Sequence, residues 1–312
     1  MKALQFTTYG TPDVLKLADL PAPEPREGEV LVRVKAAGIN PGDVKNVAGH
    51  FKAKLPGVPG RDYAGVVVGG DAESGTEVWG SGAARSGAHA EFVVVRSEWI
   101  SRKPAELSME QAAAIGVPYV TAWSAIVRAG DIQAGETIVI VGVSGAVGSA
   151  ATQIAHWKGA RVIGASTKSA NPANADELIN TTTHDLEREV RSLTDGKGAD
   201  LVLDAVGAAM FEPSLKSLRL GGRQVAIASA DRSVTFDLVD FFENESRLIG
   251  VDTAKLTGRE IAELMDTLRD GFQEGHLHAP ATTTWPLEKG VEAYEAVKQG
   301  HPRSKHVLIP AA

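Results

Sequence analysis

The sequence predicts an α/β protein with two domains, one made of short strands and one built on a doubly wound parallel sheet. At 312 residues the chain is long enough for two hydrophobic cores. Up to residue 117, short apolar runs recur between turn signals, which is typical of a compact β-barrel. From residue 137 onwards strand-like runs alternate with helical patterns, and this alternation is typical of a parallel sheet.

The N-terminal part contains short predicted strands and two loops with unusual composition. The strands are expected at residues 2–7, 29–36, 64–68, 76–79 and 90–95. The first loop, AAGINPGD at residues 36–43, follows a strand. The second, PGVPGRDYAG at residues 56–65, begins with glycine and proline and continues with a charged pair beside a tyrosine. Such loops on a strand scaffold are candidates for functional residues.

The second domain opens with a strand, a tight turn and a helix. Residues 137–141 are apolar or β-branched, and a helical pattern follows the small residues of the turn. A second apolar run at 161–165 closes a βαβ unit of the size that binds half of a dinucleotide. Glycines let the backbone approach a pyrophosphate, and the helix N-terminus favours its charge. We therefore expect a dinucleotide to contact Ser144, Gly145, Ala146, Val147 and Gly148, with Val143 replacing the first glycine of the usual G-x-G-x-x-G pattern.

The remaining elements extend this alternation. Helices are predicted at 109–115 and 119–129 before the turn; strands at 177–179, 201–206, 224–229 and 248–251, with helices at 186–193 and 213–218, follow it. The tail has helical patterns at 259–271 and 287–298 and a strand at 306–309. We expect this tail to complete the N-terminal barrel.

The end of the second strand of the βαβ unit indicates which dinucleotide binds. Enzymes that use NAD usually place an acid there to bind the ribose 2′-OH. This chain has Ser166, Thr167 and Lys168 instead, whose hydroxyls and ammonium suit a 2′-phosphate. The sequence therefore favours NADPH as the cofactor.

Composition limits the functional classes. The absence of cysteine excludes disulfides, thiolate catalysis and cysteine-ligated zinc. The net charge of −7 has no basic block, so we expect no nucleic-acid partner. No apolar run approaches the length of a membrane span and no signal-peptide pattern opens the chain, so we expect no membrane partner and a cytoplasmic location.

Several segments, spread from residue 1 to residue 310, occur in a characteristic order: MKALQFTTYGTPDVLKL, AAGINPGD, PGRDYAG, HAEFVVV, VTAWSA, VIVGVSGAVG and KHVLIP. In this order they resemble the zinc-independent quinone oxidoreductase branch of the medium-chain dehydrogenase/reductase superfamily, and the match covers nearly the whole chain. The resemblance implies a GroES-like catalytic domain, at residues 1–117 and 253–312, and a Rossmann domain at 118–252. It also implies a homodimer, by analogy with relatives that pair through the edge strand expected at 248–251.

The chain departs from the zinc alcohol dehydrogenases of this superfamily. Those enzymes hold a catalytic metal with a cysteine, a His-Glu pair and another ligand, whereas this chain has Arg61 and Asp62 in place of the His-Glu pair. The four-cysteine structural lobe is missing. His276 and His278 have a paired spacing, but they lie in a polar stretch and fit a solvent-exposed pair better. We expect no metal site.

Without a Lewis acid, hydrogen-bond donors must stabilise the negative charge that a hydride leaves on the substrate oxygen. Quinones and α,β-unsaturated carbonyls spread this charge and suit such a site. Asn40 is the first candidate, because the family places an asparagine there; the alternative is a loop-stabilising role before a proline. Tyr63 is the second candidate, as a hydrogen-bond or proton donor; the alternative is a half-buried aromatic at the barrel edge. Arg61 and Asp62 are expected mainly to brace the fold.

The resemblance also adds cofactor contacts outside the turn. Carried over at matching positions, these are Thr121, Val206, Gly207, Ser229, Gly250, Val251 and Asp252. The sequence thus predicts an NADPH-dependent, zinc-independent reductase of a small quinone or carbonyl substrate. Two alternatives stay open: an enoyl-thioester reductase, for which Lys52 and Lys54 would form a basic entrance, and a cofactor-binding protein of the same fold without turnover.

Overall fold

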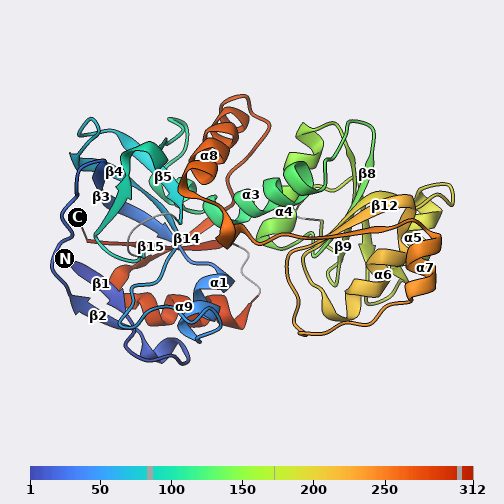
Figure 1. Cartoon of the computed structure of the whole chain (residues 1–312), viewed down its shortest axis with the longest axis horizontal. Helices are drawn as coiled ribbons and strands as arrows, with labels where there is room; N and C mark the ends of the chain where they lie inside the picture. The colour runs from blue at the N-terminus through green and yellow to red at the C-terminus, as the bar shows by residue number, and fades with distance from the viewer. Residues whose placement is uncertain (83–86, 172, 301–303, 312) are drawn as a thin grey trace. The chain divides into compact units, whose positions relative to one another are not determined.

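The computed structural model describes residues 1–82, 87–171, 173–300 and 304–311. The chain folds into two compact units (Figure 1). The barrel unit comprises Met1–Val120 with Leu256–Ala312, and the sheet unit comprises Thr121–Lys255. The domain limits expected from the sequence, 117/118 and 252/253, each lie three residues before these boundaries.

The barrel unit is built around one long strand, β3 (Glu29–Gly38). Along one edge β3 pairs with β4 (Asp62–Gly70), and along the other with β6 (Phe92–Arg96) and then β15 (Lys305–Ile309). Because β6 and β15 both pair with this edge of β3, the sheet can curve. The rest of the sheet is β5 (Glu77–Ser81) and β7 (Ser101–Arg102) beyond β4, and β14 (Thr282–Pro286) beyond β15, while β1 (Lys2–Gln5) and β2 (Lys16–Asp19) form a separate antiparallel pair.

Alternating apolar residues make the core of this unit. Val30, Val32 and Val34 of β3 point to one side and are fully or almost fully buried, because successive side chains of a strand face opposite sides. The helices of the unit are α1 (Pro41–Val47), α2 (Met109–Ala113), α8 (Gly258–Gln273) and α9 (Gly290–Gln299), and α3 (Gly116–Trp123) leads out of it; short 3₁₀ turns lie at Pro12–Val14, Ser97–Trp99 and Leu287–Lys289.

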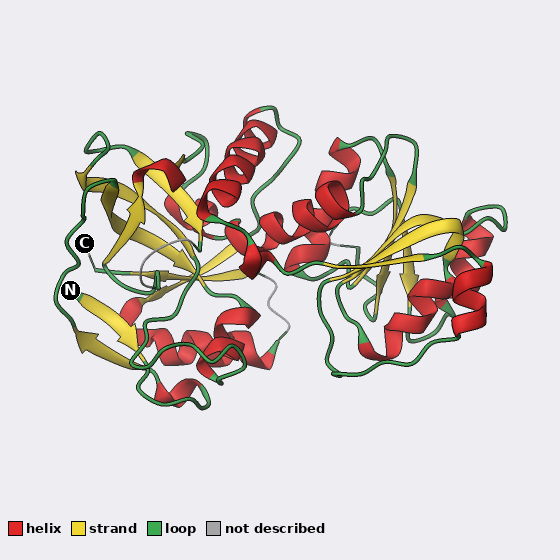
Figure 2. Ribbon diagram, in the orientation of Figure 1, coloured by secondary structure: helices red, strands yellow, loops and turns green. Residues whose placement is uncertain are grey.

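The sheet unit contains a six-stranded sheet in the order β10-β9-β8-β11-β12-β13, and every pair in it is parallel. Helices lie on both sides of the sheet (Figure 2), which confirms the doubly wound fold. The strands are β8 (Thr137–Val141), β9 (Arg161–Ser166), β10 (Glu177–Asn180), β11 (Ala199–Asp204), β12 (Leu218–Ala226) and β13 (Arg247–Gly250). The helices are α4 (Ala146–Trp157), α5 (Leu186–Leu193), α6 (Phe211–Lys216) and α7 (Leu238–Glu243), with 3₁₀ turns at Ala208–Met210 and Thr253–Lys255.

Two segments differ from the expected structure in type as well as in their bounds. The loop AAGINPGD contains the start of α1, with Asn40 as the N-cap and Pro41 in the first turn. Proline is well suited to that position because its missing N–H needs no partner there. The helix expected at 119–129 changes at Ser124 into a π-helical segment, Ser124–Ala129, and the N–H of Gly130 donates to the carbonyl of Ala125 at 2.8 Å.

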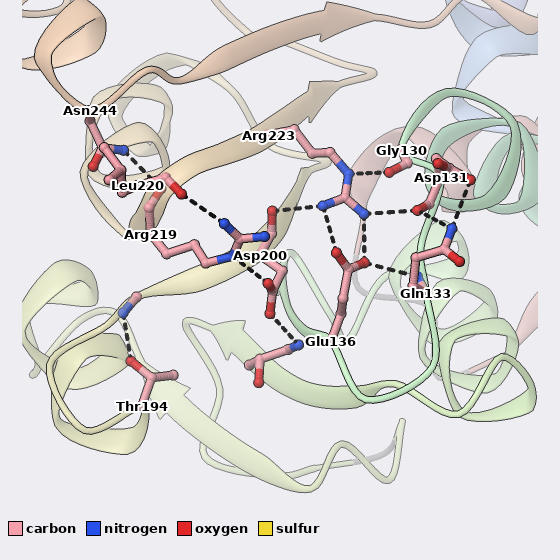
Figure 3. Close-up of polar contacts among 12 residues, drawn as sticks. Gly130, Asp131, Gln133, Glu136, Thr194, Asp200, Arg219, Leu220, Arg223 and Asn244 are labelled. Carbon is pink, nitrogen blue, oxygen red and sulfur yellow. Dashed lines mark hydrogen bonds and ion pairs between the residues drawn. The ribbon is translucent and has the colours of Figure 1, made fainter.

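A buried arginine joins the amino ends of several strands of the sheet unit (Figure 3). Arg223 donates from Nη1 to Glu136 Oε1 at 3.0 Å and to the Asp200 carbonyl at 3.1 Å. From Nη2 it donates to Glu136 Oε2 at 2.6 Å and to the Asp131 carbonyl at 2.9 Å, and from Nε to the Gly130 carbonyl. Every nitrogen of the guanidinium is therefore engaged, and the end of the π-helical segment is tied to β8, β11 and β12.

None of the helices in the described part of the chain combines the length and apolar character that crossing a membrane requires.

Candidate dinucleotide site and buried polar cluster

The parallel register brings the carboxyl ends of five strands of the sheet unit to one edge. Val141 of β8 pairs with Ala165 of β9 and with Asp204 of β11. Asp204 in turn pairs with Ala226, which pairs with Gly250. All the predicted cofactor residues except Thr121, which is in α3, lie at or just beyond these strand ends and so along a single edge, which is where open α/β sheets bind ligands. We call it the cofactor edge.

The glycine turn at this edge has the geometry of a backbone cradle. Gly142 has a φ of +83°, and its carbonyl accepts the N–H of Gly145 at 2.9 Å. A Cβ on Gly148 would lie 2.4 Å from that same carbonyl oxygen, so only glycine fits there. Helix α4 begins at Ala146, and no side chain of the described residues caps it. Its first N–H groups and its dipole therefore suit a pyrophosphate.

Val143 replaces the first glycine of the G-x-G-x-x-G pattern without changing the backbone of the turn. Its side chain is fully buried and faces Gly164 of β9. A Cβ on Gly164 would lie 2.9 Å from Val143 Cγ1, so the glycine in the neighbouring strand makes room for the valine. The departure from the usual pattern is thus compensated across the sheet and leaves the backbone of the turn in place.

The end of β9 lies beside the glycine turn. Ser144 Oγ is 3.1 Å from Ser166 Oγ, and the N–H of Lys168 donates to Ser166 Oγ at 3.1 Å. Ser166 is buried, whereas Thr167 and Lys168 are exposed. The segment therefore offers hydroxyls, an exposed ammonium and no carboxylate, a donor set that fits a phosphate monoester.

Asp204 is a residue at this edge that the sequence interpretation missed. It ends β11 fully buried and accepts the N–H groups of Val206 at 3.0 Å and Gly207 at 2.7 Å. Burial raises the pKa of this carboxyl, while the two N–H donors act against the rise. Gly207 has a φ of +68°, and the next N–H, that of Ala208, donates to Ser229 Oγ at 3.1 Å. Asp204 thus shapes the turn that carries Val206 and Gly207. An acid at the end of an apolar strand was the available signal.

Of the other predicted cofactor contacts, Thr121 lies in α3, and Val251 and Asp252 lie in the turn after β13. Thr121 Oγ1 lies 3.4 Å from Thr253 Oγ1. The N–H of Val251 donates to the Ala226 carbonyl at 3.2 Å, and Asp252 Oδ1 accepts the N–H of Ala254 at 3.0 Å. These contacts place Val251 and Asp252 directly beyond Gly250 and the end of β13.

In the barrel unit, the first catalytic candidate lies in a buried polar cluster. Asn40 is only 3% exposed. Its backbone N–H donates to Asp43 Oδ2 at 2.8 Å, its Nδ2 donates to Asp62 Oδ2 at 2.8 Å, and its Oδ1 accepts from Lys305 Nζ. Asp62 Oδ1 accepts from Ser81 Oγ at 2.7 Å and from the N–H of Val117 at 2.9 Å.

This cluster carries an unusual charge balance for a protein interior. Burial raises the pKa of Asp43 to about 6, and the nearby Asp62 carboxylate adds to the rise. Burial lowers the pKa of Lys305, although Asp62 and Asp43 oppose the effect. Two carboxyls and one amine thus share a largely desolvated site, so their protonation states are interdependent.

A neutral histidine adjoins the cluster. His89 Nε2 is 3.2 Å from the Gly38 carbonyl, which can only accept, so this nitrogen carries the hydrogen. Its Nδ1, 2.8 Å from Tyr294 Oη, therefore accepts from the phenol. Burial lowers the pKa of His89 to about 4, and the ring is neutral at physiological pH.

Tyr63, the second catalytic candidate, lies in the core of the barrel unit. It is 1% exposed and belongs to the cluster that contains Val30 and Val93. Burial raises its pKa well above the ordinary value of a phenol. A Cβ on Gly80 would lie 2.6 Å from its Oη, so this glycine accommodates the ring. These facts favour the structural alternative for Tyr63, and a role in proton transfer stays a prediction.

The polar cluster also contains residues that the sequence interpretation did not single out: Asp43, Ser81, His89, Tyr294 and Lys305. Of these residues, Lys305 was the easiest to find from the sequence, because it opens β15, whose last three residues are apolar.

The histidine pair is exposed as predicted. His276 and His278 both follow α8 and are both exposed, and the backbone carbonyl of His278 accepts the phenol of Tyr119 at 2.6 Å. Within the described residues there is no group of three or more metal-binding side chains.

Comparison with known proteins identifies the family. Residues 26–105 match the GroES-like domain of alcohol dehydrogenases, and residues 146–270 match the family described as zinc-binding dehydrogenase. Human quinone oxidoreductase is 32% identical over 313 aligned positions, which cover 96% of this chain and 94% of that protein. The chain belongs to the quinone oxidoreductase branch of the medium-chain dehydrogenase/reductase superfamily.

Solved structures of other proteins resemble this quinone oxidoreductase-like chain along its whole length. A mycobacterial protein complexed with NADPH has a TM-score of 0.88 at 25% identity, covering 99% of this chain and all of that one. An enoyl reductase, JamJ, has a TM-score of 0.85 at 25% identity and 99% coverage of both chains. Together with the geometry of the cofactor edge, the NADPH complex points to a nicotinamide cofactor for this branch member.

Proposed function

We propose that the protein is an NADPH-dependent, zinc-independent reductase of quinones or α,β-unsaturated carbonyls. The observation that carries the proposal is the cofactor edge. Ser144, in the glycine turn before the uncapped start of α4, lies with its Oγ 3.1 Å from the Oγ of Ser166, and Ser166 is two residues before the exposed Lys168. The human relative supports a quinone as the substrate class. The lack of cysteine and the presence of Arg61-Asp62 in place of a His-Glu pair support chemistry without zinc.

In this proposal each group has a separate task. Gly145 to Gly148 bind the pyrophosphate, and Ser166, Thr167 and Lys168 bind the 2′-phosphate. Thr121, Val206, Gly207, Ser229 and Gly250 to Asp252 line the rest of the dinucleotide. The reduced nicotinamide, when bound, supplies a hydride. Asn40 donates a hydrogen bond from Nδ2 to the substrate oxygen, on which negative charge then develops.

The test is turnover by metal-free protein. Protein dialysed against a chelator is supplied with NADPH or NADH and a panel of quinones and enones, and cofactor oxidation is followed by absorbance. We expect turnover of at least one quinone or enone and a higher kcat/KM with NADPH. Binding of NADPH without turnover of any substrate would instead support the cofactor-binding alternative.

The variant Tyr63→Phe, in the same assay, tests the second catalytic candidate. If Tyr63 donates a proton, the variant has a lower kcat; if Tyr63 only fills the core, kcat is unchanged.

The enoyl-thioester alternative has its own observation and its own discriminating substrate. The JamJ neighbour is an enoyl reductase, and Lys52 and Lys54 are exposed in the segment after α1. An enoyl thioester with a phosphopantetheine arm is compared with an enone of the same acyl chain. This alternative is favoured if kcat/KM is much larger for the thioester than for the enone, and if kcat/KM for the thioester falls in the double variant Lys52→Ala/Lys54→Ala.

We also propose a homodimer that pairs through β13. This strand is the edge of the sheet, and Arg247 and Leu248 on it are exposed. Unpaired strand edges with apolar side chains are templates for association. A small molecule is the proposed substrate, and a cytoplasmic location stays a prediction.

A further inference from the structure

Lys305 pairs its buried ammonium with an amide. It begins β15, is 9% exposed, and bonds from Nζ to Asn40 Oδ1. Its backbone N–H donates to the Ala281 carbonyl at 2.7 Å, which anchors the residue in the sheet. Taking an ammonium out of water costs several kcal/mol, and a direct carboxylate partner is the usual compensation. Here Asn40 stands between the ammonium and Asp62, which the same amide bonds through Nδ2 at 2.8 Å.

The two charged neighbours fix the orientation of the Asn40 amide. An ammonium can only donate and a carboxylate can only accept, so Oδ1 must face Lys305 and Nδ2 must face Asp62. A flipped amide would set the NH₂ group against the ammonium and the oxygen against the carboxylate. The bond to Asp62 uses one of the two Nδ2 hydrogens. Among the described residues no acceptor bonds the second hydrogen, and in the proposed mechanism this hydrogen donates to the substrate oxygen.

The positive charge also changes the strength of that donor. A cation bonded to the amide oxygen withdraws electron density from the NH₂ group, and hydrogen bonds in such a chain strengthen one another in a low dielectric. A donor that faces a developing oxyanion is worth more when it is preorganised in this way. Lys305 thus influences a substrate oxygen through Asn40 without touching it.

We propose that Lys305 is a positioning residue of the reduction, which orients and polarises the Asn40 amide toward the substrate oxygen. This inference rests on the proposed function. The competing role is purely structural, because β15 also pairs with β3 and closes the barrel. The two roles differ in one respect: a residue that acts through Asn40 has no effect on catalysis once the Asn40 amide is gone.

The experiment is a double-mutant cycle on kcat with metal-free protein, NADPH and the best quinone or enone. We expect Lys305→Met to lower kcat about 10- to 100-fold, which is less than the roughly 100- to 1,000-fold lost with a whole oxyanion donor, because the Asn40 amide itself remains. The Kd for NADPH should stay within about twofold of the wild type. In an Asn40→Ala background, Lys305→Met should change kcat by less than about twofold. Lys298→Met, a half-exposed lysine on α9, is the control for loss of a lysine.

An equal fall of kcat in both backgrounds, or no fall in the wild-type background, overturns the positioning role. If Lys305→Met yields no folded protein, Lys305→Gln keeps a neutral hydrogen-bond donor and takes its place in the same cycle. If the wild-type protein turns over no quinone or enone, the proposed function is wrong, and the positioning role of Lys305 is wrong with it. An active wild type with equal losses overturns the Lys305 inference alone.

Discussion

At the scale of single residues, burial decides the chemistry of the polar groups in the barrel unit. Asp43, Asp62 and Lys305 are all at most 9% exposed. In water an aspartate is ionised and a lysine is protonated at neutral pH, whereas the interior penalises both charges. Protonation of Asp43 therefore lies within the range of ordinary pH experiments and gives a residue-level prediction.

Replacing Asp43 with Asn should change how stability depends on pH. The folded pKa of Asp43, about 6, is above the ordinary aspartate value of 3.8. Protonated Asp43 therefore makes a contribution to the free energy of unfolding that is fully present below the pKa of the unfolded chain and is lost as the pH rises through about 6. Relative to Asp43→Asn, the wild type should be more stable at pH 5 than at pH 8 by roughly 1 kcal/mol. Chemical unfolding at both pH values measures it, and an identical pH dependence for both proteins would contradict it.

Lys168 allows a residue-level prediction about the cofactor. Its exposed ammonium follows Ser166 at the cofactor edge. Lys168→Ala should raise the Kd for NADPH about tenfold, which corresponds to about 1.4 kcal/mol. It should leave the Kd for NADH nearly unchanged, because NADH lacks the 2′-phosphate. Titration by cofactor fluorescence measures both constants, with Lys197→Ala, an exposed lysine beyond α5, as a surface control. Equal loss for both cofactors would remove Lys168 from the phosphate site.

At the scale of elements, the two ends of the strands in the sheet unit have different roles. The carboxyl ends of the strands carry the cofactor edge, and the amino ends are held by Arg223 (Figure 3). The Arg223 and Glu136 side chains are 10% and 16% exposed, whereas the Arg219 side chain, which pairs with Asp200 nearby, is 42% exposed. The two pairs therefore offer a matched comparison of a buried and an exposed ion pair.

Arg223→Met should destabilise the protein by about 3 kcal/mol, because it leaves the Glu136 carboxylate and three backbone carbonyls without their buried donor. Arg219→Met should cost less than about 1 kcal/mol, since solvent screens the exposed pair. Thermal and chemical unfolding of both variants measure the difference. Similar losses for both arginines would show that Arg223 does not hold the strand ends as proposed.

At the scale of the whole molecule, the two compact units are joined by two chain crossings, near residues 120 and 255. A dinucleotide bound only by the sheet unit stabilises that unit against unfolding and leaves the barrel unit without direct gain. NADPH at about 100 times its Kd should add about 2.7 kcal/mol to the free energy of unfolding of the sheet unit. Hydrogen exchange resolved by peptide should show the gain in residues 121–255, and equal protection of both units would contradict it.

Metal removal gives a second prediction at this scale. Prolonged chelation should leave both kcat and the melting temperature of the protein unchanged, because the chain has no cysteine to hold zinc by thiolate and, in the proposed mechanism, the Asn40 amide takes the place of the Lewis acid. Elemental analysis of the purified protein checks that no zinc remains. Loss of activity on chelation that added zinc restores would overturn zinc independence.

Local chemistry made much of this protein predictable from its sequence. Residues 137–148 predicted a strand, a glycine turn and a helix, because each of these has strong local preferences, and β8 has the predicted bounds. The ends of elements were less predictable. The strand expected at 201–206 ends at Asp204, since its carboxylate accepts the N–H groups of the next turn, and α1 begins within a segment whose proline and glycine predicted a loop.

The sequence by itself determined the fold class, the glycine turn and the chemical character of the β9 end, since these depend on neighbours along the chain. Only the tertiary structure decided what surrounds Asn40. Lys305 is 265 positions away from it and Asp62 is 22 positions away, and no local pattern links them. The pairing of β15 and β4 with β3 brings the three together. The same packing buries Tyr63 and raises the pKa of Asp43, because burial depends on the whole fold and not on the residue.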